Sequence, residues 1–411
     1  QMPENKFKFV VDGSVTSPVG FKAAGITAGL KRSGKPDMAL IVSDVPATAA
    51  GTFTTCKFAA APVRICQKRI AAGKPIRGVI VNSGNANACT GAQGLKDAET
   101  MCALTAEAVG SANADEFFVS STGRIGVNMP MDTISAGITK AAAALNYEGG
   151  KVAANAIMTT DTVPKSAAVA VPIGSGLVTI GGTTKGAGMI DPQMAALHAT
   201  MLCYLTTDAE IEADLLNKML FKAVDASYNR INIDGDMSTN DTTLMFANGF
   251  SGLKVESEEE IELFSAALTA LCQKLAREMV LDGEGVTKFV AINIKGAESQ
   301  ADAKLCDEAI ANSLLCKSAW FGCDPNWGRV VAAIGYSGAS FDPDKVTVDY
   351  NDKPVVRDGG DAGTPEAVLA QELKAGEFAI NINLNAGDFD YWVWTNDISY
   401  EYVKINAEYH T

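Results

Sequence analysis

Histidine is almost absent from this chain, which has two in 411 residues, His198 and His410. A Ser-His-Asp or Cys-His triad needs a histidine held between a nucleophile and an orienting acid. His410 is the penultimate residue and His198 lies two positions from Thr200, so both are poor candidates for that role. Neither an H-E-x-x-H nor a G-x-S-x-G motif occurs. The sequence therefore predicts no metal site and no histidine-dependent hydrolase.

Long apolar runs and paired cysteines are also missing. No run approaches the roughly 20 apolar residues that span a bilayer, and the first residues carry neither a signal-peptide core nor an Arg-rich transit pattern. The 9 cysteines are an odd number, lie far apart and form no C-x-x-C pair, which is typical of buried, reduced thiols. We therefore expect a cytoplasmic protein without disulfides.

Basic charge is in short supply, with 34 Lys and Arg against 48 Asp and Glu and a formal net charge of −14. This balance argues against nucleic acid or an anionic membrane surface as a partner. Apolar residues make up 47% of the chain and charged residues 20%, as in ordinary globular proteins. The length suits two closely packed domains or one large α/β unit.

One stretch comes close to a phosphate-binding loop. Residues 29–35 read Gly-Leu-Lys-Arg-Ser-Gly-Lys, but Pro36 stands where the motif requires Ser or Thr. Proline also removes a backbone donor where a phosphate would need one. We interpret this stretch as a turn.

Strand-like and helix-like patterns intermix along the chain. Strand-like runs cover 78–82, 167–171, 289–294 and 378–383, and helical patterns cover 94–109, 132–145, 207–226, 258–279 and 365–374. The last two strand-like runs alternate apolar with polar residues, which predicts sheets with one buried face. The pattern over 258–279 has its acids first and its bases last, which suits the helix dipole. Without a regular βαβ rhythm, we expect a layered mixed α/β fold rather than a barrel or a Rossmann sheet.

Glycine clusters punctuate this pattern at 83–85, 121–123, 181–182, 185–188 and 282–285. Glycine permits positive φ and lets a backbone approach a ligand closely. An isolated cluster is best explained as a turn. Several clusters flanked by Thr, Lys or Glu favour a ligand site.

One nucleophile needs no histidine. A threonine at a chain N-terminus uses its own α-amine as general base, and the ordinary pKa of such an amine is ~7.7–8.0. An internal threonine gains the amine only if the preceding peptide bond is cut. The residue before it should be small, so that the hydroxyl can reach the carbonyl. The pair Ala199-Thr200 fits, although Ala-Thr is a common dipeptide.

A longer match gives this pair more weight. Residues 185–192, Lys-Gly-Ala-Gly-Met-Ile-Asp-Pro, followed by Ala199-Thr200-Met201-Leu202, closely resemble the autoprocessing region of the ornithine acetyltransferase (glutamate N-acetyltransferase) family. Similar matches occur in order at 20–25, 41–51, 82–91, 121–123, 157–162, 234–241, 282–285, 324–329 and 406–411. One match would be weak, whereas this ordered series is specific.

The resemblance implies a self-processing precursor with the layered mixed α/β fold of that family, in two intimately packed domains. It would cut itself between Ala199 and Thr200, leaving an alpha chain of residues 1–199 and a beta chain of residues 200–411. The fragments would stay together, commonly as a heterotetramer of two of each. Thr200 would take the acetyl group of N-acetylornithine and pass it to glutamate, in arginine biosynthesis. No cofactor is implied, and use of acetyl-CoA as a co-substrate is left open.

The resemblance also assigns site residues. Thr122 and Gly123 match the oxyanion hole, where donors meet charge that develops in the transition state. Thr159, Lys185, Thr200, Glu284, Asn406 and Thr411 match substrate-contacting positions. By type, a lysine can pair with a substrate carboxylate or carbonyl oxygen, and a glutamate with an ammonium. The alternatives are a solvated lysine, a turn carboxylate, a threonine bonded to its own backbone and an unordered tail.

The spacing before Thr200 departs from the family. Its nucleophile usually follows the lysine by eleven residues, an offset that here falls on Ala196, four residues short of Thr200. Four residues make about one helical turn, which a helix can absorb while keeping its face. Two other classes stay open: a self-cleaving amidohydrolase or aminopeptidase on a related scaffold, which would pass the acyl group to water, and an uncleaved binding protein.

Overall fold

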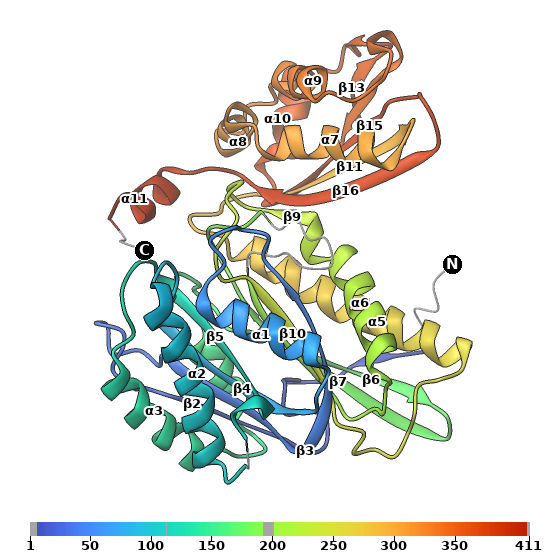
Figure 1. Ribbon diagram of the computed structural model, residues 1–411. Helices are drawn as coiled ribbons and strands as arrows, with labels where there is room; N and C mark the ends of the chain where they lie inside the picture. The colour runs from blue at the N-terminus through green and yellow to red at the C-terminus, as the bar shows by residue number, and fades with distance from the viewer. Residues whose placement is uncertain (1–5, 112, 192–200, 409–411) are drawn as a thin grey trace.

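The computed structural model describes residues 6–111, 113–191 and 201–408, which form two β-sheets with helices packed against them (Figure 1). A larger unit holds a nine-stranded sheet, and a smaller C-terminal unit, orange to red in Figure 1, holds most of a seven-stranded sheet. The predicted mixed α/β fold is confirmed. Within the described residues, no helix combines the length and apolarity needed to cross a membrane.

The nine-stranded sheet is folded into two halves by one long strand. Its strands, in spatial order, are β1 (Lys8–Phe9), β6 (Lys165–Ile173), β7 (Gly176–Lys185), β8 (Leu202–Thr207), β10 (Thr242–Ala247), β3 (Met38–Phe53), β4 (Ile76–Asn85) and β5 (Phe117–Arg124), with β2 (Phe21–Ile26) paired to β3. The start of β3 pairs with β2 and β4, whereas its end pairs with β10. The rings of Phe118 and Phe246 meet between the halves, with centroids 5.8 Å apart.

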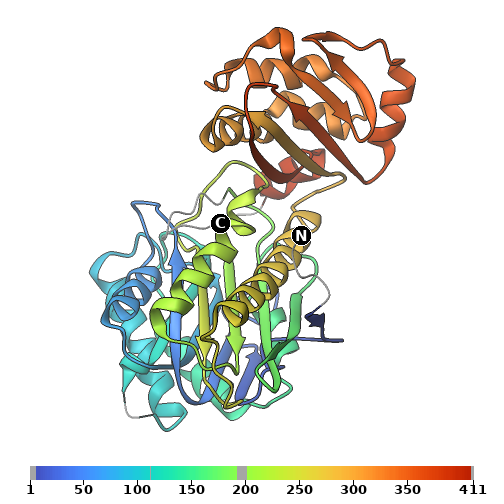
Figure 2. The same cartoon turned by 90° about the vertical axis from the view of Figure 1, so that its right-hand side faces the viewer.

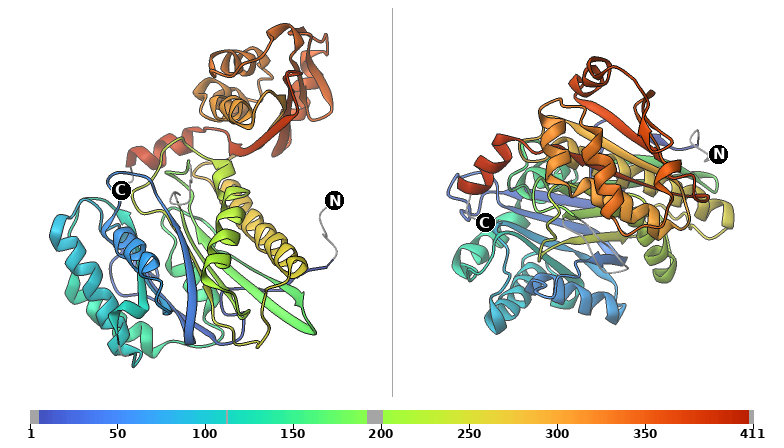
Figure 3. Two further views of the ribbon diagram at one scale, coloured as in Figure 1. Left: turned by 45° about the vertical axis from the view of Figure 1, so that its right-hand side comes forward. Right: turned by 90° about the horizontal axis from the view of Figure 1, so that it is seen from above.

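Helices cover the outer face of each half. Figure 2 shows α5 (Ala213–Asp225) and α6 (Glu258–Leu281) side by side on the half that contains β6 and β7. On the other half lie α2 (Gly91–Ala108) and α3 (Met131–Ala143), and Figure 3 shows the strands between the two helical layers. Along β3, Leu40 packs toward α2 and α3, while Ile41 packs between the halves. This arrangement explains why a strand-like run such as 167–171 is apolar at every position, since both faces of its strand are buried. The shorter helices of this unit are α1 (Ala61–Ala72) and α4 (Gly150–Ala156).

Most predicted elements are confirmed. The patterns over 94–109, 132–145, 258–279 and 365–374 correspond to α2, α3, α6 and α10 (Glu366–Lys374), and the strand-like runs lie in β4, β6, β11 (Phe289–Ala297) and β15 (Glu377–Asn383). Ser257 and Glu260 form a capping box at the start of α6, which satisfies two otherwise unpaired donors.

The helix predicted over 207–226 begins too early. The chain stays in strand β8 through Thr207, and α5 starts only at Ala213. The Thr207 hydroxyl donates to Thr179 O at 2.8 Å, and the Asp208 carboxylate accepts the N–H of Thr179 at 2.9 Å. These bonds to the neighbouring strand stabilise the extended conformation over local helix propensity.

The seven-stranded sheet lies almost wholly in the C-terminal unit. Its order is β14 (Gly360–Asp361), β13 (Lys353–Arg357), β12 (Thr347–Tyr350), β15, β11, β16 (Phe389–Asn396) and β9 (Ile231–Asn232). The helices are α7 (Gln300–Ala311), α8 (Leu314–Phe321), α9 (Trp327–Tyr336) and α10. The units are closely packed, since α6 contacts β9 and β16 and Arg277 pairs with Glu377 at 2.6 Å. The last helix, α11 (Tyr400–Glu408), leaves this unit toward the larger one (Figure 1).

The predicted division at 199/200 does not separate two folded units. Strands β8 and β10 follow it in sequence, yet both lie between β7 and β3 in the nine-stranded sheet. The passage between the units instead occurs after α6, before β11. Cleavage itself stays a prediction, because Ala199 and Thr200 lie outside the described residues. Fragments 1–199 and 200–411 would share one sheet and its cores.

The near-match to a phosphate loop is a turn, as predicted. The backbone N–H groups of residues 28–31 donate to the Asp37 carboxylate at 2.6–3.2 Å. The donors that a phosphate would need are therefore already occupied by a side chain of the same chain. All nine cysteines are free thiols.

Candidate active site

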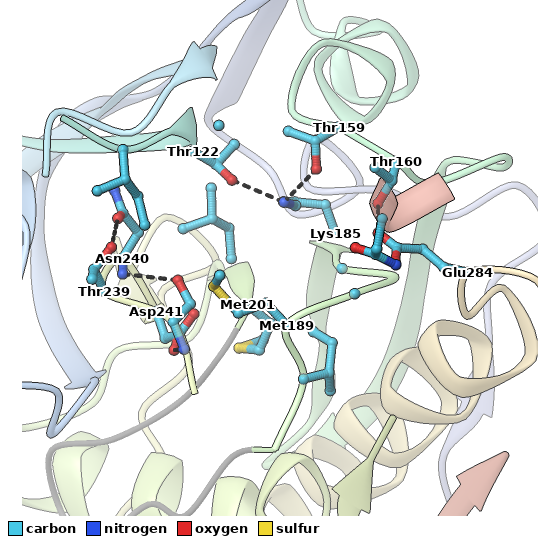
Figure 4. Close-up of a pocket in the computed structure, with 18 residues that line it drawn as sticks. Thr122, Thr159, Thr160, Lys185, Met189, Met201, Thr239, Asn240, Asp241 and Glu284 are labelled. Atoms are coloured by element: carbon cyan, nitrogen blue, oxygen red, sulfur yellow. Dashed lines mark hydrogen bonds between the residues drawn. The ribbon is translucent and has the colours of Figure 1, made fainter. Parts of the chain in front are cut away.

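A cavity in the larger unit brings together residues from distant parts of the sequence (Figure 4). It holds about 750 Å³ of empty space, part of it open to solvent. Six predicted site residues line it: Thr122, Gly123, Thr159, Lys185, Glu284 and Asn406. Thr200 and Thr411 lie outside the described residues.

Lys185, the last residue of β7, lies at the centre of this group. Its buried ammonium donates to the hydroxyl oxygens of Thr122 at 2.9 Å and Thr159 at 3.0 Å (Figure 4). An ammonium can only donate, so both hydroxyl oxygens accept and keep their own protons for another acceptor. Burial lowers the pKa of Lys185 below its ordinary value, although the charge of Asp161 opposes the shift.

Glycine is required beside Thr122 because two strands approach closely there. Gly123 has φ +133°, and a Cβ at this position would lie 2.5 Å from the carbonyl carbon of Gly84 in β4 and 2.6 Å from the nitrogen of Asn85. No side chain fits such a gap. The close approach places the end of β5 in the cavity wall.

The Glu284 carboxylate is held from two sides. The Thr160 hydroxyl donates to Oε1 at 2.7 Å, and the Asn406 amide donates to Oε2 at 2.6 Å. A Cβ on Gly188 would lie 2.3 Å from Oε1, so glycine there leaves room for the carboxylate. One fixed negative charge is thus presented to the cavity.

Asn406 reaches the cavity because α11 folds back over it. The Tyr402 hydroxyl donates to Asp234 at 3.0 Å, and the Ser399 hydroxyl donates to Gly285 O at 2.6 Å. These contacts fix the helix to two loops of the larger unit. A role for Asn406 requires the C-terminal tail to fold back over the cavity. The chain follows this path through residue 408.

The chain enters the cavity wall directly after position 200. Met201 is buried and lines the cavity, and its carbonyl oxygen accepts the N–H of Thr242 at 2.8 Å. The next residue, Leu202, is the cross-strand partner of Lys185 in the β7–β8 ladder. The residue that follows Thr200 in sequence is thus anchored beside the predicted oxyanion and substrate residues.

Comparison with known proteins identifies the family. The sequence model described as "ArgJ family" matches residues 22–411. The chain belongs to the ArgJ family. An arginine biosynthesis bifunctional protein of Symbiobacterium thermophilum is 47% identical over 403 residues, which cover 97% of this chain and 99% of the relative. A glutamate N-acetyltransferase of Methanocaldococcus jannaschii is 47% identical over 411 residues, which cover 98% of this chain and 100% of the relative.

One solved structure is similar in sequence to part of this chain. The ornithine acetyltransferase of Mycobacterium tuberculosis, complexed with ornithine, is 40% identical to this chain, with a TM-score of 0.43. The match covers 47% of this chain and 99% of that one. The match of the family model and the two full-length relatives confirm the resemblance to the ornithine acetyltransferase family.

Several cavity residues of this member of the ArgJ family were not predicted from the sequence. Asn240 donates to Ala86 O at 2.5 Å and to Ser121 O at 2.7 Å, which fixes the ends of β4 and β5. Thr160 holds Glu284. The signal available was a run of consecutive polar residues in each case, at 238–241 and 159–162, inside matched segments.

Proposed function

We propose that this protein moves an acetyl group from N-acetylornithine to glutamate. Its family membership makes it an acetyltransferase of arginine biosynthesis. The observation that carries the proposal is the meeting of Thr122, Lys185 and Glu284 in one cavity, with Met201 in its wall.

The nucleophile in this proposal is Thr200, made available by self-cleavage after Ala199. Cleavage turns the nitrogen of Thr200 into an α-amine, which can take the proton of the Thr200 hydroxyl. The anchored start of β8 supports this assignment. The main-chain bond at Met201 and the pairing of Leu202 with Lys185 tie the new chain end to the cavity wall.

The acyl step follows from the positions of the donors. The Thr200 oxygen attacks the acetyl carbonyl, and the α-amine accepts the proton. The resulting oxyanion would accept hydrogen bonds from the Thr122 hydroxyl, whose proton is not engaged by Lys185, and from the backbone at Gly123. Collapse of this intermediate breaks the bond to the nitrogen of ornithine, which leaves as an amine with the proton returned by the α-ammonium, and acetyl-Thr200 remains. The neutral amine of glutamate then attacks that ester and regenerates Thr200.

Binding of the amino acids rests on two opposite charges across the cavity. The Glu284 carboxylate, oriented by Thr160 and Asn406, would hold a substrate ammonium. The Lys185 ammonium would attract a carboxylate or the acetyl oxygen, with Thr159 as its second support. Thr411, at the end of the tail that brings Asn406 to the site, would add a further contact.

The remaining expectations complete this proposal. The fragments would assemble as a heterotetramer of two alpha and two beta chains in the cytoplasm. The transfer would need no cofactor, and acetyl-CoA would act as a second acetyl donor if the enzyme is bifunctional. The shared sheet supports a lasting association of the fragments, since β8 lies between β7 and β10.

The deciding experiment separates transfer from hydrolysis. We expect glutamate to accelerate the release of ornithine from N-acetylornithine. One N-acetylglutamate should form for each ornithine released. Ornithine release at the same rate without glutamate, with free acetate as the product, would instead identify an amidohydrolase. An uncleaved chain that binds N-acetylornithine without releasing ornithine would identify a binding protein.

A further inference from the structure

A buried cluster of three charged side chains lies directly behind the cavity. Lys165, the first residue of β6, donates from its ammonium to Asp161 Oδ2 at 2.6 Å and to Asp282 Oδ2 at 2.7 Å. The side chains of Asp161, Lys165 and Asp282 are 0%, 1% and 8% exposed. Burying charge is costly unless each group is paired, so this arrangement calls for a role.

The ammonium of Lys165 is fully satisfied. Besides the two carboxylates, it donates to Val163 O at 3.1 Å, which occupies all three of its N–H donors. Asp282 also accepts the backbone N–H of Thr162 at 2.9 Å. Two carboxylates against one ammonium leave the cluster with one net negative charge.

The cluster joins the three segments that carry the substrate residues. Asp161 lies two positions after Thr159, and Asp282 lies two positions before Glu284. Asp161 Oδ2 also accepts the backbone N–H of Gly186, next to Lys185, at 2.9 Å. One carboxylate therefore bonds both to the cluster and to the main chain that positions Lys185.

The charge of the cluster complements that of Lys185. Burial tends to raise the pKa of Asp161, but the charges of Lys165 and Lys185, together with the hydrogen bonds from Gly186 and Lys165, hold this pKa below its ordinary value. Asp161 is therefore ionised. The charged groups that act on Lys185 are Asp161, Lys165, Asp241, Glu284 and Lys31. Among them, Asp161 exerts the largest effect after burial, in the direction that favours the protonated lysine.

We propose that Asp161 is a positioning residue of the acetyl transfer, which fixes the main chain at Gly186 and supplies the negative charge that balances Lys185. This inference rests on the proposed function of the cavity. Lys165 and Asp282 hold Asp161 in place. They link the segments of Thr159, Lys185 and Glu284 into one rigid frame.

The primary test is Asp161→Asn in the full-length protein, processed as the wild type is. The change keeps the shape and removes the charge, so kcat should fall about 10²-fold, as expected for a misplaced reacting group. The alkaline limb of the pH–kcat profile should move to lower pH, because Lys185 loses the charge that favours its protonated form. A merely structural residue would lower the amount of folded enzyme without moving this limb.

A second variant restores the net charge. Asp161→Asn alone leaves Lys165 and Asp282, which sum to zero charge, whereas Asp161→Asn with Lys165→Gln leaves the negative charge of Asp282. In the double variant Asp282 still accepts the backbone N–H of Thr162, so this variant is a second test of the inference if the single variant does not fold. The alkaline limb of its pH–kcat profile should return toward that of the wild type. Its kcat should stay low, because the ion pairs that link the three segments are lost.

The matched control is Asp352→Asn, which removes an exposed carboxylate paired with Lys353 in the C-terminal unit and should leave both readouts unchanged. An Asp161→Asn enzyme with wild-type kcat and an unmoved alkaline limb would overturn the inference, as would a double variant with no recovery of that limb. The proposed function fails separately, if wild-type enzyme shows no glutamate-dependent release of ornithine.

Discussion

The cavity end of the nine-stranded sheet buries charged side chains, whereas the interior of the seven-stranded sheet is lined mainly by apolar ones. In the first, Lys165, Lys185 and Asp161 are buried and each has partners at 2.6–3.0 Å. In the second, the strands present Val348, Ile380 and other apolar residues to an apolar core. The cavity end of the larger unit therefore holds paired buried charges, whereas the apolar core of the C-terminal unit contributes packing.

One buried acid in the C-terminal unit makes the contrast clear. Asp307 of α7 is fully buried, and neither carboxylate oxygen has a hydrogen-bond partner among the described residues. Burial raises the pKa of Asp307 well above its ordinary range, which favours the neutral form of this side chain, whereas the charges around Asp161 favour its ionised form. The comparison teaches that burial without a partner shifts the pKa of an acid upward, whereas nearby opposite charges hold the pKa of a buried acid down.

Among the substitutions that test this contrast between the two sheets, the largest loss of activity is expected at Thr122. Thr122→Ala removes the predicted oxyanion donor, which should lower kcat roughly 10²–10³-fold, or about 2.7–4 kcal/mol. KM should change little, because the bond forms mainly in the transition state. Steady-state kinetics measures the split. A variant with unchanged kcat and raised KM would reassign Thr122 to ground-state binding.

A smaller effect is expected at Asn406, the contact through which α11 reaches the cavity. Asn406→Ala removes the amide that donates to Glu284 at 2.6 Å, a bond to a charged group worth about 1.5–3 kcal/mol. We expect kcat/KM for N-acetylornithine to fall accordingly, chiefly through KM. Asn217→Ala, which removes an exposed amide on α5, serves as the matched control. Equal kinetics in both variants would show that α11 does not support the site.

The smallest effect is expected in the apolar core of the C-terminal unit. Ile380→Val removes one buried methylene, which should lower the free energy of unfolding by about 0.5–1.5 kcal/mol. Because Ile380 packs away from the cavity, kcat and KM should match the wild type. Urea unfolding and steady-state kinetics on the same preparation measure both quantities. A loss of kcat without a loss of stability would contradict the division of roles between the two sheets.

The fold was predictable where local signals and packing agree. Helix α6 has its cap and its charge gradient in the sequence, and β15 alternates in step with its one buried face. The start of α5 was not predictable, because bonds to β7 keep Thr207 extended. Such bonds depend on a neighbouring strand that local periodicity does not reveal.

The site residues were predictable from the family resemblance, but not from residue spacing or hydrophobic periodicity. Thr122 and Lys185 are 63 positions apart, and nothing in their spacing places them at hydrogen-bond distance. The matched motifs supplied them. Asp161, Lys165 and Asp282 read in sequence as ordinary surface charges, and only the folded sheet shows them as a buried cluster.

The account depends most on Thr200, and intact mass tests it directly. We expect mature protein to contain a chain that begins Thr200-Met201-Leu202-Cys203, identified by N-terminal sequencing. Incubation with N-acetylornithine alone should make this chain heavier by a single acetyl group, because the covalent intermediate accumulates without an acceptor. Thr200→Ala should remain one chain and acquire no acetyl group. A processed and active Thr200→Ala variant, or a wild type that transfers acetyl with no acetylated chain, would contradict the central claim.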